Sequence, residues 1–221
     1  MRPVIILRPE PGASATLARA RALGLPAILL PLFTVESLSL SLPDPAMFDA
    51  LLLTSANAVR HSGAELAKLR ELPVHAVGAA TAEAARAVGL TIASTGRGGV
   101  DELLATLPDH LRLLHLCGEE RTGTSSGHRI MHVPVYRSVP IEVPAEMEQA
   151  AGSVALVHSP RAGRRLAELL DGREDVRVAA ISPAAATACG SGWAAIEAAP
   201  EPTDTALLSL AARLCQQLDP K

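Results

Sequence analysis

Residues 49–55, DALLLTS, recur at residues 153–159 as SVALVHS, an offset of 104 positions (153 − 49). Each copy has four apolar residues, then a polar residue and a serine. The same offset places residues 76–81, AVGAAT, on residues 180–185, AISPAA. Short apolar runs that end in hydroxyl residues before an Ala-rich segment are typical of buried parallel strands followed by helices. One offset shared by two separate motifs therefore predicts two similar βα units.

Apolar runs alternate with Ala-rich helical patterns along the rest of the chain. The pattern predicts strands at residues 4–7, 27–33, 50–53, 74–77, 91–93, 111–116, 154–157, 176–181 and 194–197. It predicts helices at residues 13–23, 56–69, 81–88, 100–107, 161–170, 184–191 and 204–218. Continuous apolar strands separated by helices indicate an α/β fold, here two similar lobes, each with a parallel sheet flanked by helices.

Two strand-like stretches bounded by prolines, residues 34–45 and 130–144, fall outside this alternation. We interpret them as paired crossings that form a two-stranded linker. Lobe 1 is then discontinuous, residues 1–33 plus 140–221, and lobe 2, residues 46–129, is inserted into it. The crossings occupy residues 34–45 and 130–139.

The composition argues against several classes of protein. Only 2% of the residues are aromatic and the net charge is −3, so the stacking platform and basic surface of nucleic-acid binders are not expected. No apolar run approaches the roughly 18 residues of a membrane helix. Three widely spaced cysteines fit neither a disulfide framework nor a metal knuckle. We therefore expect a cytoplasmic protein with reduced thiols and no membrane partner.

Hydroxyl residues and glycine recur where strands lead into helices. In open parallel sheets, ligands bind at the carboxyl ends of the strands, where helix N-termini favour anions. Helix capping alone explains any one of these residues; it does not explain why both lobes carry the same junctions. The junction residues are Ser55, Gly78, Thr81, Ser159 and Ser182.

Other chemistries have weaker support. The nucleotide motifs GxxxxGK[ST] and GxGxxG are absent from these junctions, and no Ser/His/Asp set of a hydrolase can be placed from the sequence. His128 and His132 are four residues apart, but in a predicted strand and without a third ligand nearby, so no metal site is predicted. Tyr136, the only tyrosine, lies in the second crossing. It either faces the space between the lobes or covers the hinge.

An ordered series of short motifs resembles the uroporphyrinogen-III synthase family over nearly the whole chain. The motifs are Arg8-Pro9 after the first strand, LTSANAV (residues 53–59), AVGAATA (residues 76–82), LCGE (residues 116–119), VYR (residues 135–137) and VHSP (residues 157–160). The resemblance implies two α/β lobes and a cofactor-independent lyase of tetrapyrrole and heme biosynthesis. Its substrate would be hydroxymethylbilane, a linear tetrapyrrole with many carboxylates. It would close to uroporphyrinogen III with loss of water and inversion of ring D through a spiro intermediate.

The resemblance also implies roles for individual residues. Main-chain amides and small hydroxyls would hold the carboxylates in the cleft between the lobes, at Ser55, Thr81, Ser159 and Ser182, with Gly78 allowing close backbone approach. Tyr136 would assist departure of the hydroxyl, and Arg8, Arg137 and Arg161 are candidate carboxylate partners. The chain departs from the family pattern at Ser182 and Ala185, where many members have glycine and threonine. It departs again at residues 118–134, where a full helix is usual.

Two other functions fit the same pattern. One is a non-catalytic two-lobed binding module for a small anionic ligand. The other is a sugar-phosphate or nucleotide enzyme on a doubly wound fold, which the missing phosphate loop disfavours. In each case we expect a monomer with a small-molecule partner.

Overall fold

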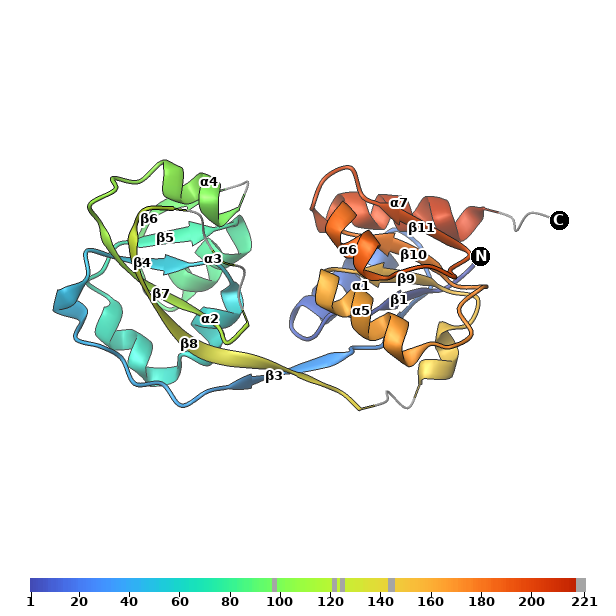
Figure 1. Ribbon diagram of the computed structural model, residues 1–221, viewed down its shortest axis with the longest axis horizontal. Helices are drawn as coiled ribbons and strands as arrows, with labels where there is room; N and C mark the ends of the chain where they lie inside the picture. Colours follow the sequence, from blue (N-terminus) through green and yellow to red (C-terminus); the bar gives the residue numbers. More distant parts are fainter. Residues whose placement is uncertain (97–98, 121–122, 124–125, 143–145, 218–221) are drawn as a thin grey trace. The chain divides into compact units, whose positions relative to one another are not determined.

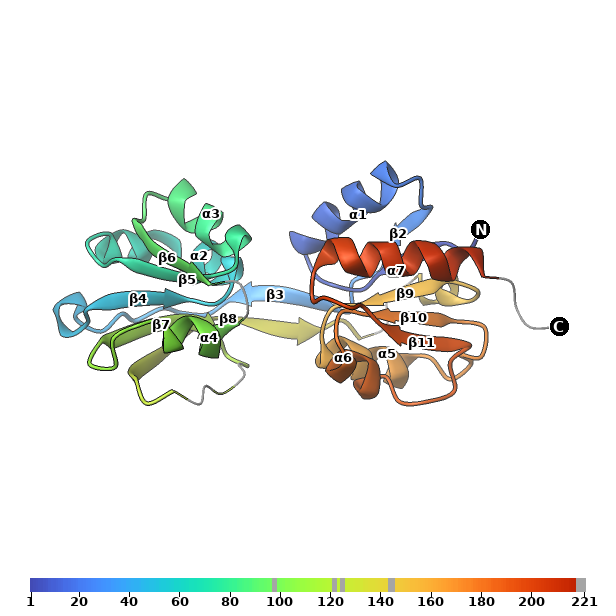
Figure 2. The ribbon, with the colours of Figure 1, turned by 90° about the horizontal axis from the view of Figure 1, so that it is seen from above.

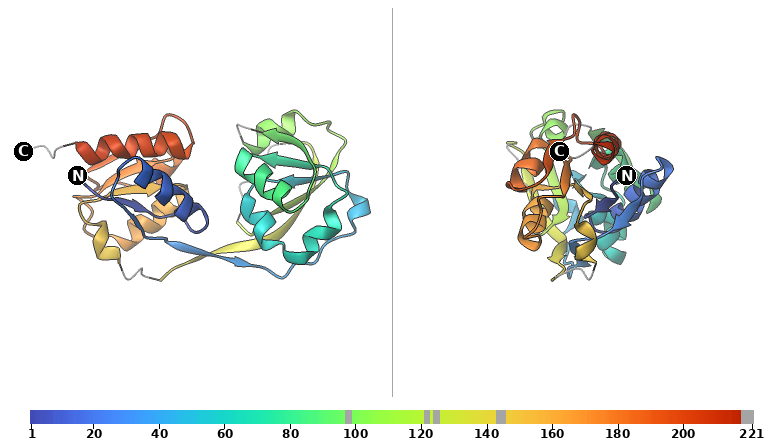
Figure 3. Two further views of the ribbon diagram at one scale, coloured as in Figure 1. Left: turned by 180° about the vertical axis from the view of Figure 1, so that it is seen from behind. Right: turned by 90° about the vertical axis from the view of Figure 1, so that its right-hand side faces the viewer.

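The chain forms two compact units, shown in Figures 1 and 3. The computed structural model describes residues 1–96, 99–120, 123, 126–142 and 146–217. Unit 1 consists of Met1–Thr34 and Val139–Lys221, and unit 2 of Val35–Ser138. The chain thus passes from one unit to the other twice.

Unit 1 is built on a five-stranded parallel sheet with the order β11-β10-β9-β1-β2. Its strands are β1 (Val4–Ile6), β2 (Ala27–Leu29), β9 (Val154–Val157), β10 (Arg177–Ala180) and β11 (Ala195–Ala198). Helices α1 (Gly12–Ala22) and α7 (Asp204–Gln216) pack on one face of the sheet. Helices α5 (Pro160–Leu169) and α6 (Pro183–Ala188) cover the other face, as the view from above shows (Figure 2). The 3₁₀ helix η3 (Met147–Ala150) packs into the same hydrophobic core as these two helices.

Unit 2 contains most of a six-stranded sheet with the order β3-β8-β7-β4-β5-β6. Its strands are β3 (Phe33–Ser37), β4 (Ala50–Leu53), β5 (Val74–Val77), β6 (Ile92–Gly96), β7 (Arg112–Gly118) and β8 (Arg129–Pro140). Helices α2 (Ala56–His61) and α3 (Ala79–Ala87) and the 3₁₀ helix η2 (Gly63–Leu69) cover one face, and α4 (Val100–Ala105) packs on the other. A 3₁₀ turn, η1 (Pro45–Met47), precedes β4.

Strands β3 and β8 are antiparallel neighbours at the edge of this sheet. Leu38 N donates to Val135 O at 3.0 Å, and Ile141 N donates to Leu32 O at 3.0 Å. Residue numbers rise along one strand as they fall along the other (38 + 135 = 32 + 141), which defines the antiparallel pairing. The boundaries between the units fall within these two strands, after Thr34 and after Ser138.

The two copies of the repeated motif occupy matching places in the two sheets. Residues 50–53 form β4 and residues 154–157 form β9, each fully buried and each followed by a capped helix. Helices on both faces exclude water from these strands, so every position is apolar. The predicted fold class, two parallel α/β sheets flanked by helices, is confirmed.

Several sequence-based boundaries were wrong, and three of the larger errors are the following. The strand predicted at residues 27–33 is interrupted between β2 and β3 at Pro31, which lacks the N–H that a ladder requires. The helix predicted at residues 56–69 ends at His61, and the chain continues as 3₁₀ helix because Gly63 has a φ of 58°. Of the strand-like stretch 34–45, only the first residues, to Ser37, belong to β3.

The second crossing is mostly strand, because β8 runs from Arg129 to Pro140, while residues 143–145 lie outside the described residues. Within 119–128, residues 121–122 and 124–125 also lie outside them. The described part of that segment contains no helix. None of the helices in the described part of the chain is long and apolar enough to cross a lipid bilayer.

A buried arginine anchors the last helix of unit 1. Arg177 in β10 is 3% exposed and donates from Nη1 to the carbonyl oxygens of Leu214 and Gln217, both at 2.7 Å. These carbonyls have no partner within the helix because they lie at its C-terminus. The guanidinium therefore fixes α7 on the sheet, and with it Asp204 at the opposite end of the helix.

Candidate functional site

The predicted serines of unit 1 lie at the carboxyl ends of neighbouring strands. Ser159 follows β9 and its hydroxyl oxygen accepts from Ala162 N at 3.1 Å, capping α5. Ser182 follows β10 and accepts from Ala185 N at 3.3 Å, capping α6. Capping uses an oxygen lone pair, and a serine hydroxyl also carries a proton to donate. Both serines can therefore cap a helix and donate to a carboxylate.

A cluster of polar side chains gathers beside these serines around Asp204, the first residue of α7. His158 Nε2 lies 2.9 Å from Asp204 Oδ1, and Arg19 Nη1 lies 2.7 Å from Oδ2. The hydroxyl of Thr16, which is fully buried, donates to both carboxylate oxygens at 3.0 and 3.1 Å. Arg8 Nη1 is 3.6 Å from Oδ1. The carboxylate thus joins the ends of β1 and β9 to α1 and α7.

Burial and hydrogen bonding together determine the protonation states of Asp204 and His158. Burial alone would raise the pKa of Asp204, but hydrogen bonds from His158, Arg19 and Thr16 outweigh it and hold the pKa well below its usual value. Burial lowers the pKa of His158, and Asp204 offsets only part of this effect. At neutral pH Asp204 is therefore ionised and His158 neutral, so His158 donates its Nε2 proton to the carboxylate.

Arg8 is held in place from several sides. Its Nη1 approaches the Thr16 hydroxyl at 3.5 Å, and a β-carbon at Gly12 would overlap its guanidinium. Glycine at this position therefore leaves the space that the arginine occupies. The Arg8 side chain is still 35% exposed. A pre-oriented, partly exposed guanidinium is suited to pairing with a carboxylate.

Unit 2 has equivalent strand-end groups. Ser55 follows β4 and its hydroxyl oxygen accepts from Asn57 N at 3.2 Å, capping α2. Gly78 follows β5 with a φ of 83°, and a β-carbon there would meet no atom within 4 Å. The surface at Gly78 is thus open for close approach to the first turn of α3. Thr81 lies in that turn but is only 5% exposed, so its side chain belongs mainly to the core.

Tyr136 lies on β8, next to the end of β7. Its ring and hydroxyl lie so close to Gly118 that a β-carbon there would approach them to 3.0–3.1 Å. The ring also faces His61 at the end of α2, with 5.8 Å between centroids. The tyrosine is thus held by a glycine on one strand and an imidazole on a helix, both in unit 2.

The other two predicted arginines have partners of their own. Arg137 donates from Nε and Nη2 to Glu36 Oε2 at 3.1 and 2.9 Å, in an exposed pair. The Arg161 guanidinium lies 4.5 Å from the centroid of the Phe33 ring. Of the predicted site residues, Ser55, Gly78, Thr81, Tyr136 and Arg137 belong to unit 2. Arg8, Ser159, Arg161 and Ser182 belong to unit 1.

Sequence reasoning missed the cluster around Asp204. The signal was present, because Asp204 directly follows a helix-capping threonine, Thr203, in the connection between β11 and α7. The motif that contains His158 was also noted, although only its serine was given a role. Neither observation indicated that the two side chains meet.

The fold and these groups define an α/β protein of two similar units, with hydroxyls, helix N-termini and a pre-oriented arginine at the strand ends. The family model described as uroporphyrinogen-III synthase HemD matches residues 14–209, so the chain belongs to this family of lyases in tetrapyrrole biosynthesis. No curated protein sequence matches it significantly.

Two solved structures share the fold. Uroporphyrinogen-III synthetase from Helicobacter pylori is 19% identical, with a TM-score of 0.70, and the match covers 97% of this chain and 100% of that one. A mutant uroporphyrinogen III synthase from Thermus thermophilus is 18% identical, with a TM-score of 0.56, covering 98% and 100%.

Proposed function

We propose that this chain converts hydroxymethylbilane to uroporphyrinogen III, with loss of water and inversion of ring D through a spiro intermediate. Family membership supports the reaction class. The observation that carries the proposal is that both units place a capping serine at the C-terminal end of an equivalent strand, Ser55 after β4 and Ser159 after β9. A substrate with many carboxylates needs many such anion-binding groups.

The proposed reaction needs little acid or base catalysis from the protein. The substrate's own pyrrole nitrogen drives loss of the terminal hydroxyl, and the carbocation-like carbon is then attacked by the substituted carbon of ring D. The protein must hold the two ends of the linear tetrapyrrole so that this attack is favoured over direct closure. Orientation of this kind is worth up to about 7–11 kcal/mol in favourable cases.

The carboxylates are proposed to bind the strand-end groups. Ser55, Ser159 and Ser182 donate their hydroxyl protons, and the helix N-termini behind them add a favourable dipole of about 0.3–1 kcal/mol each. Arg8 supplies a charged contact, and the ionised Asp204 behind it keeps the guanidinium in one orientation. A hydrogen bond to a charged group contributes about 1.5–3 kcal/mol.

Tyr136 is proposed to assist departure of the hydroxyl. Its ring is held between Gly118 and His61, so its phenol keeps one position. A phenol donates a hydrogen bond to a leaving hydroxyl without transferring its proton completely. Its contribution is therefore smaller than that of a full general acid.

The reaction is tested by supplying hydroxymethylbilane and separating the isomers after oxidation. We expect isomer III in excess of the spontaneous isomer I. Isomer I alone, at the uncatalysed rate, would refute the proposal.

Carboxylate binding at the capping serines is tested by a matched pair of variants. Asparagine and aspartate cap helices about as well as serine, but only aspartate repels a carboxylate. Ser55→Asp should raise KM at least about fivefold, since two like charges about 4 Å apart cost 1 kcal/mol or more. Ser55→Asn should stay near wild type. Equal KM values for the two variants would mean that no substrate carboxylate binds at Ser55.

A further inference from the structure

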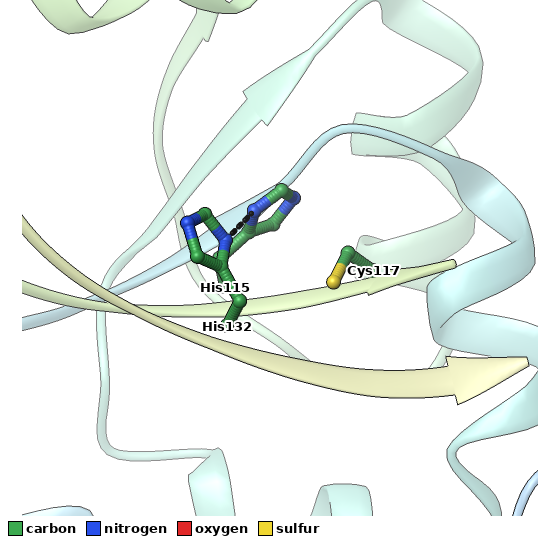
Figure 4. A group of neighbouring side chains, drawn as sticks. All are labelled: His115, Cys117 and His132. Carbon is green, nitrogen blue, oxygen red and sulfur yellow. Dashed lines mark hydrogen bonds between the residues drawn. The ribbon is translucent and has the colours of Figure 1, made fainter. Parts of the chain in front are cut away.

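Three side chains with metal-binding chemistry converge on one face of the sheet in unit 2. They are His115 and Cys117 on β7 and His132 on β8, and their ligand atoms all lie within 4.8 Å of one another. His115 and Cys117 are 3% and 1% exposed, and His132 is partly buried. Figure 4 shows the two imidazoles beside each other, with Cys117 further along β7.

The strand register brings these residues together. Residues two apart on a strand share a face, which places Cys117 beside His115. In the parallel pairing of β7 with β8, His115 lies opposite His132. Sequence spacing could not show this pairing, since it depends on which residues of β8 align with β7.

The two imidazoles meet through the same type of nitrogen. His115 Nδ1 lies 3.0 Å from His132 Nδ1, so one nitrogen must carry the proton and the other must offer its lone pair. Two Nδ1 ligands on a tetrahedral zinc ion, with bonds of about 2.0–2.1 Å, lie about 3.3 Å apart. The imidazole pair thus needs only a small separation to accept an ion in place of the shared proton.

A polar partner outside the cluster orients His115. Its Nε2 lies 3.0 Å from the Thr54 hydroxyl, at the end of β4. Histidines that bind metals through one nitrogen usually donate the proton of the other to such a partner, which fixes the ring. With Nδ1 on an ion, Nε2–H of His115 would donate to Thr54.

We propose that His115 Nδ1, His132 Nδ1 and Cys117 Sγ form a Zn²⁺ site in unit 2, with the fourth position held by water. Two imidazoles and one thiolate are donors that suit zinc, and oxygen-seeking ions such as Mg²⁺ do not compete for them. On binding, Cys117 loses its thiol proton, and the Nδ1 proton shared by the two rings moves to Nε2 of the donating ring. The site uses none of the substrate-binding serines and does not depend on the proposed reaction.

Zn²⁺ binding is measured on the full, tag-free chain after treatment with a chelator and a reductant. Calorimetric titration should show one ion bound per chain, with release of about one proton because zinc takes the thiolate. Mg²⁺ should give no such signal. Co²⁺ in place of Zn²⁺ should produce a thiolate-to-cobalt absorption band.

Variants assign the ligands. Cys117→Ser should abolish the cobalt thiolate band, and His132→Gln should weaken Zn²⁺ binding more than about tenfold, the lower limit seen for outer partners. Thr54→Val, which removes only the outer hydroxyl, should weaken binding about tenfold. His75→Gln removes another buried histidine of unit 2 and Cys189→Ser another buried thiol, and neither should change binding.

Circular dichroism shows whether each variant folds. If a ligand variant does not fold, two other results decide whether zinc binds here. One is the cobalt band and proton release of the wild type, and the other is the Zn²⁺ affinity of Thr54→Val. The proposal is overturned if the wild type does not take up one Zn²⁺. It is also overturned if uptake is unchanged in folded Cys117→Ser and His132→Gln.

Discussion

His158 Nε2 donates to Asp204 Oδ1 at 2.9 Å, although 46 residues separate them in the chain. They meet because β9 ends and α7 begins at the same edge of the unit 1 sheet. The Asp204 carboxylate also accepts hydrogen bonds from Thr16 and Arg19. Through these contacts Asp204 stabilises unit 1 and also holds the Arg8 guanidinium in place.

Removing the Asp204 carboxylate should destabilise unit 1. Asp204→Ala leaves the buried donors His158 and Thr16 without their shared acceptor, which costs about 1–3 kcal/mol for each unsatisfied group. Trp193, the only tryptophan, belongs to unit 1, so its fluorescence during urea unfolding follows this unit. Glu201→Ala removes an exposed carboxylate from the same connection and should change stability by less than about 0.5 kcal/mol. Equal losses in the two variants would contradict this role.

His158 should make unit 1 less stable in mildly acidic solution. Its pKa is lowered in the folded protein, so the unfolded chain takes up a proton that the folded state resists. The stability is fully present above the unfolded pKa, about 6.5, and is lost as pH falls below it. Asp204, whose pKa is also lowered, adds a second loss only as pH falls below about 4.

The test is the free energy of unfolding from Trp193 fluorescence between pH 8 and pH 5. His158→Gln should flatten the dependence of stability on pH in this interval. A variant that keeps the wild-type slope would show that another group is responsible.

Alanine variants at Gly78 and Gly89 separate the effect of backbone strain on stability from an effect on catalysis. Their φ angles are 83° and 84°, and neither has a close neighbour that a β-carbon would strike. Alanine at either position should destabilise unit 2 by about 1–3 kcal/mol, because L-residues disfavour positive φ. Only Gly78 lies at the strand end proposed for substrate binding, so Gly78→Ala should also lower kcat/KM. If Gly89→Ala lowers kcat/KM equally, the effect is one of stability.

Tyr136→Phe should lower kcat by less than about 100-fold, the lower limit for full general acid catalysis. Gly118→Ala should lower kcat similarly by displacing the ring, since its β-carbon would approach the phenol to about 3 Å. Both are measured as initial rates of isomer III formation, with circular dichroism as the control for folding. Complete loss of activity in folded Tyr136→Phe would mean that the phenol transfers its proton fully.

Much of the fold could be predicted because the local pattern is consistent. Residues 50–53 and 154–157 are apolar throughout, and each precedes a serine that caps a helix. The boundaries failed where a single residue changed the backbone, at Pro31 and Gly63. The capping serines were found for the same local reason, whereas the burial of Thr81 depended on packing against other elements.

The sequence by itself determined that this chain makes two parallel α/β units with hydroxyl residues at the strand ends, because strand periodicity and helix capping are local. Only the tertiary structure decided that Asp204 joins His158 and that His115 lies opposite His132. The physical reason is the same for both pairs. Contacts across a sheet edge or between paired strands depend on strand order and register, which the packing of the whole unit selects.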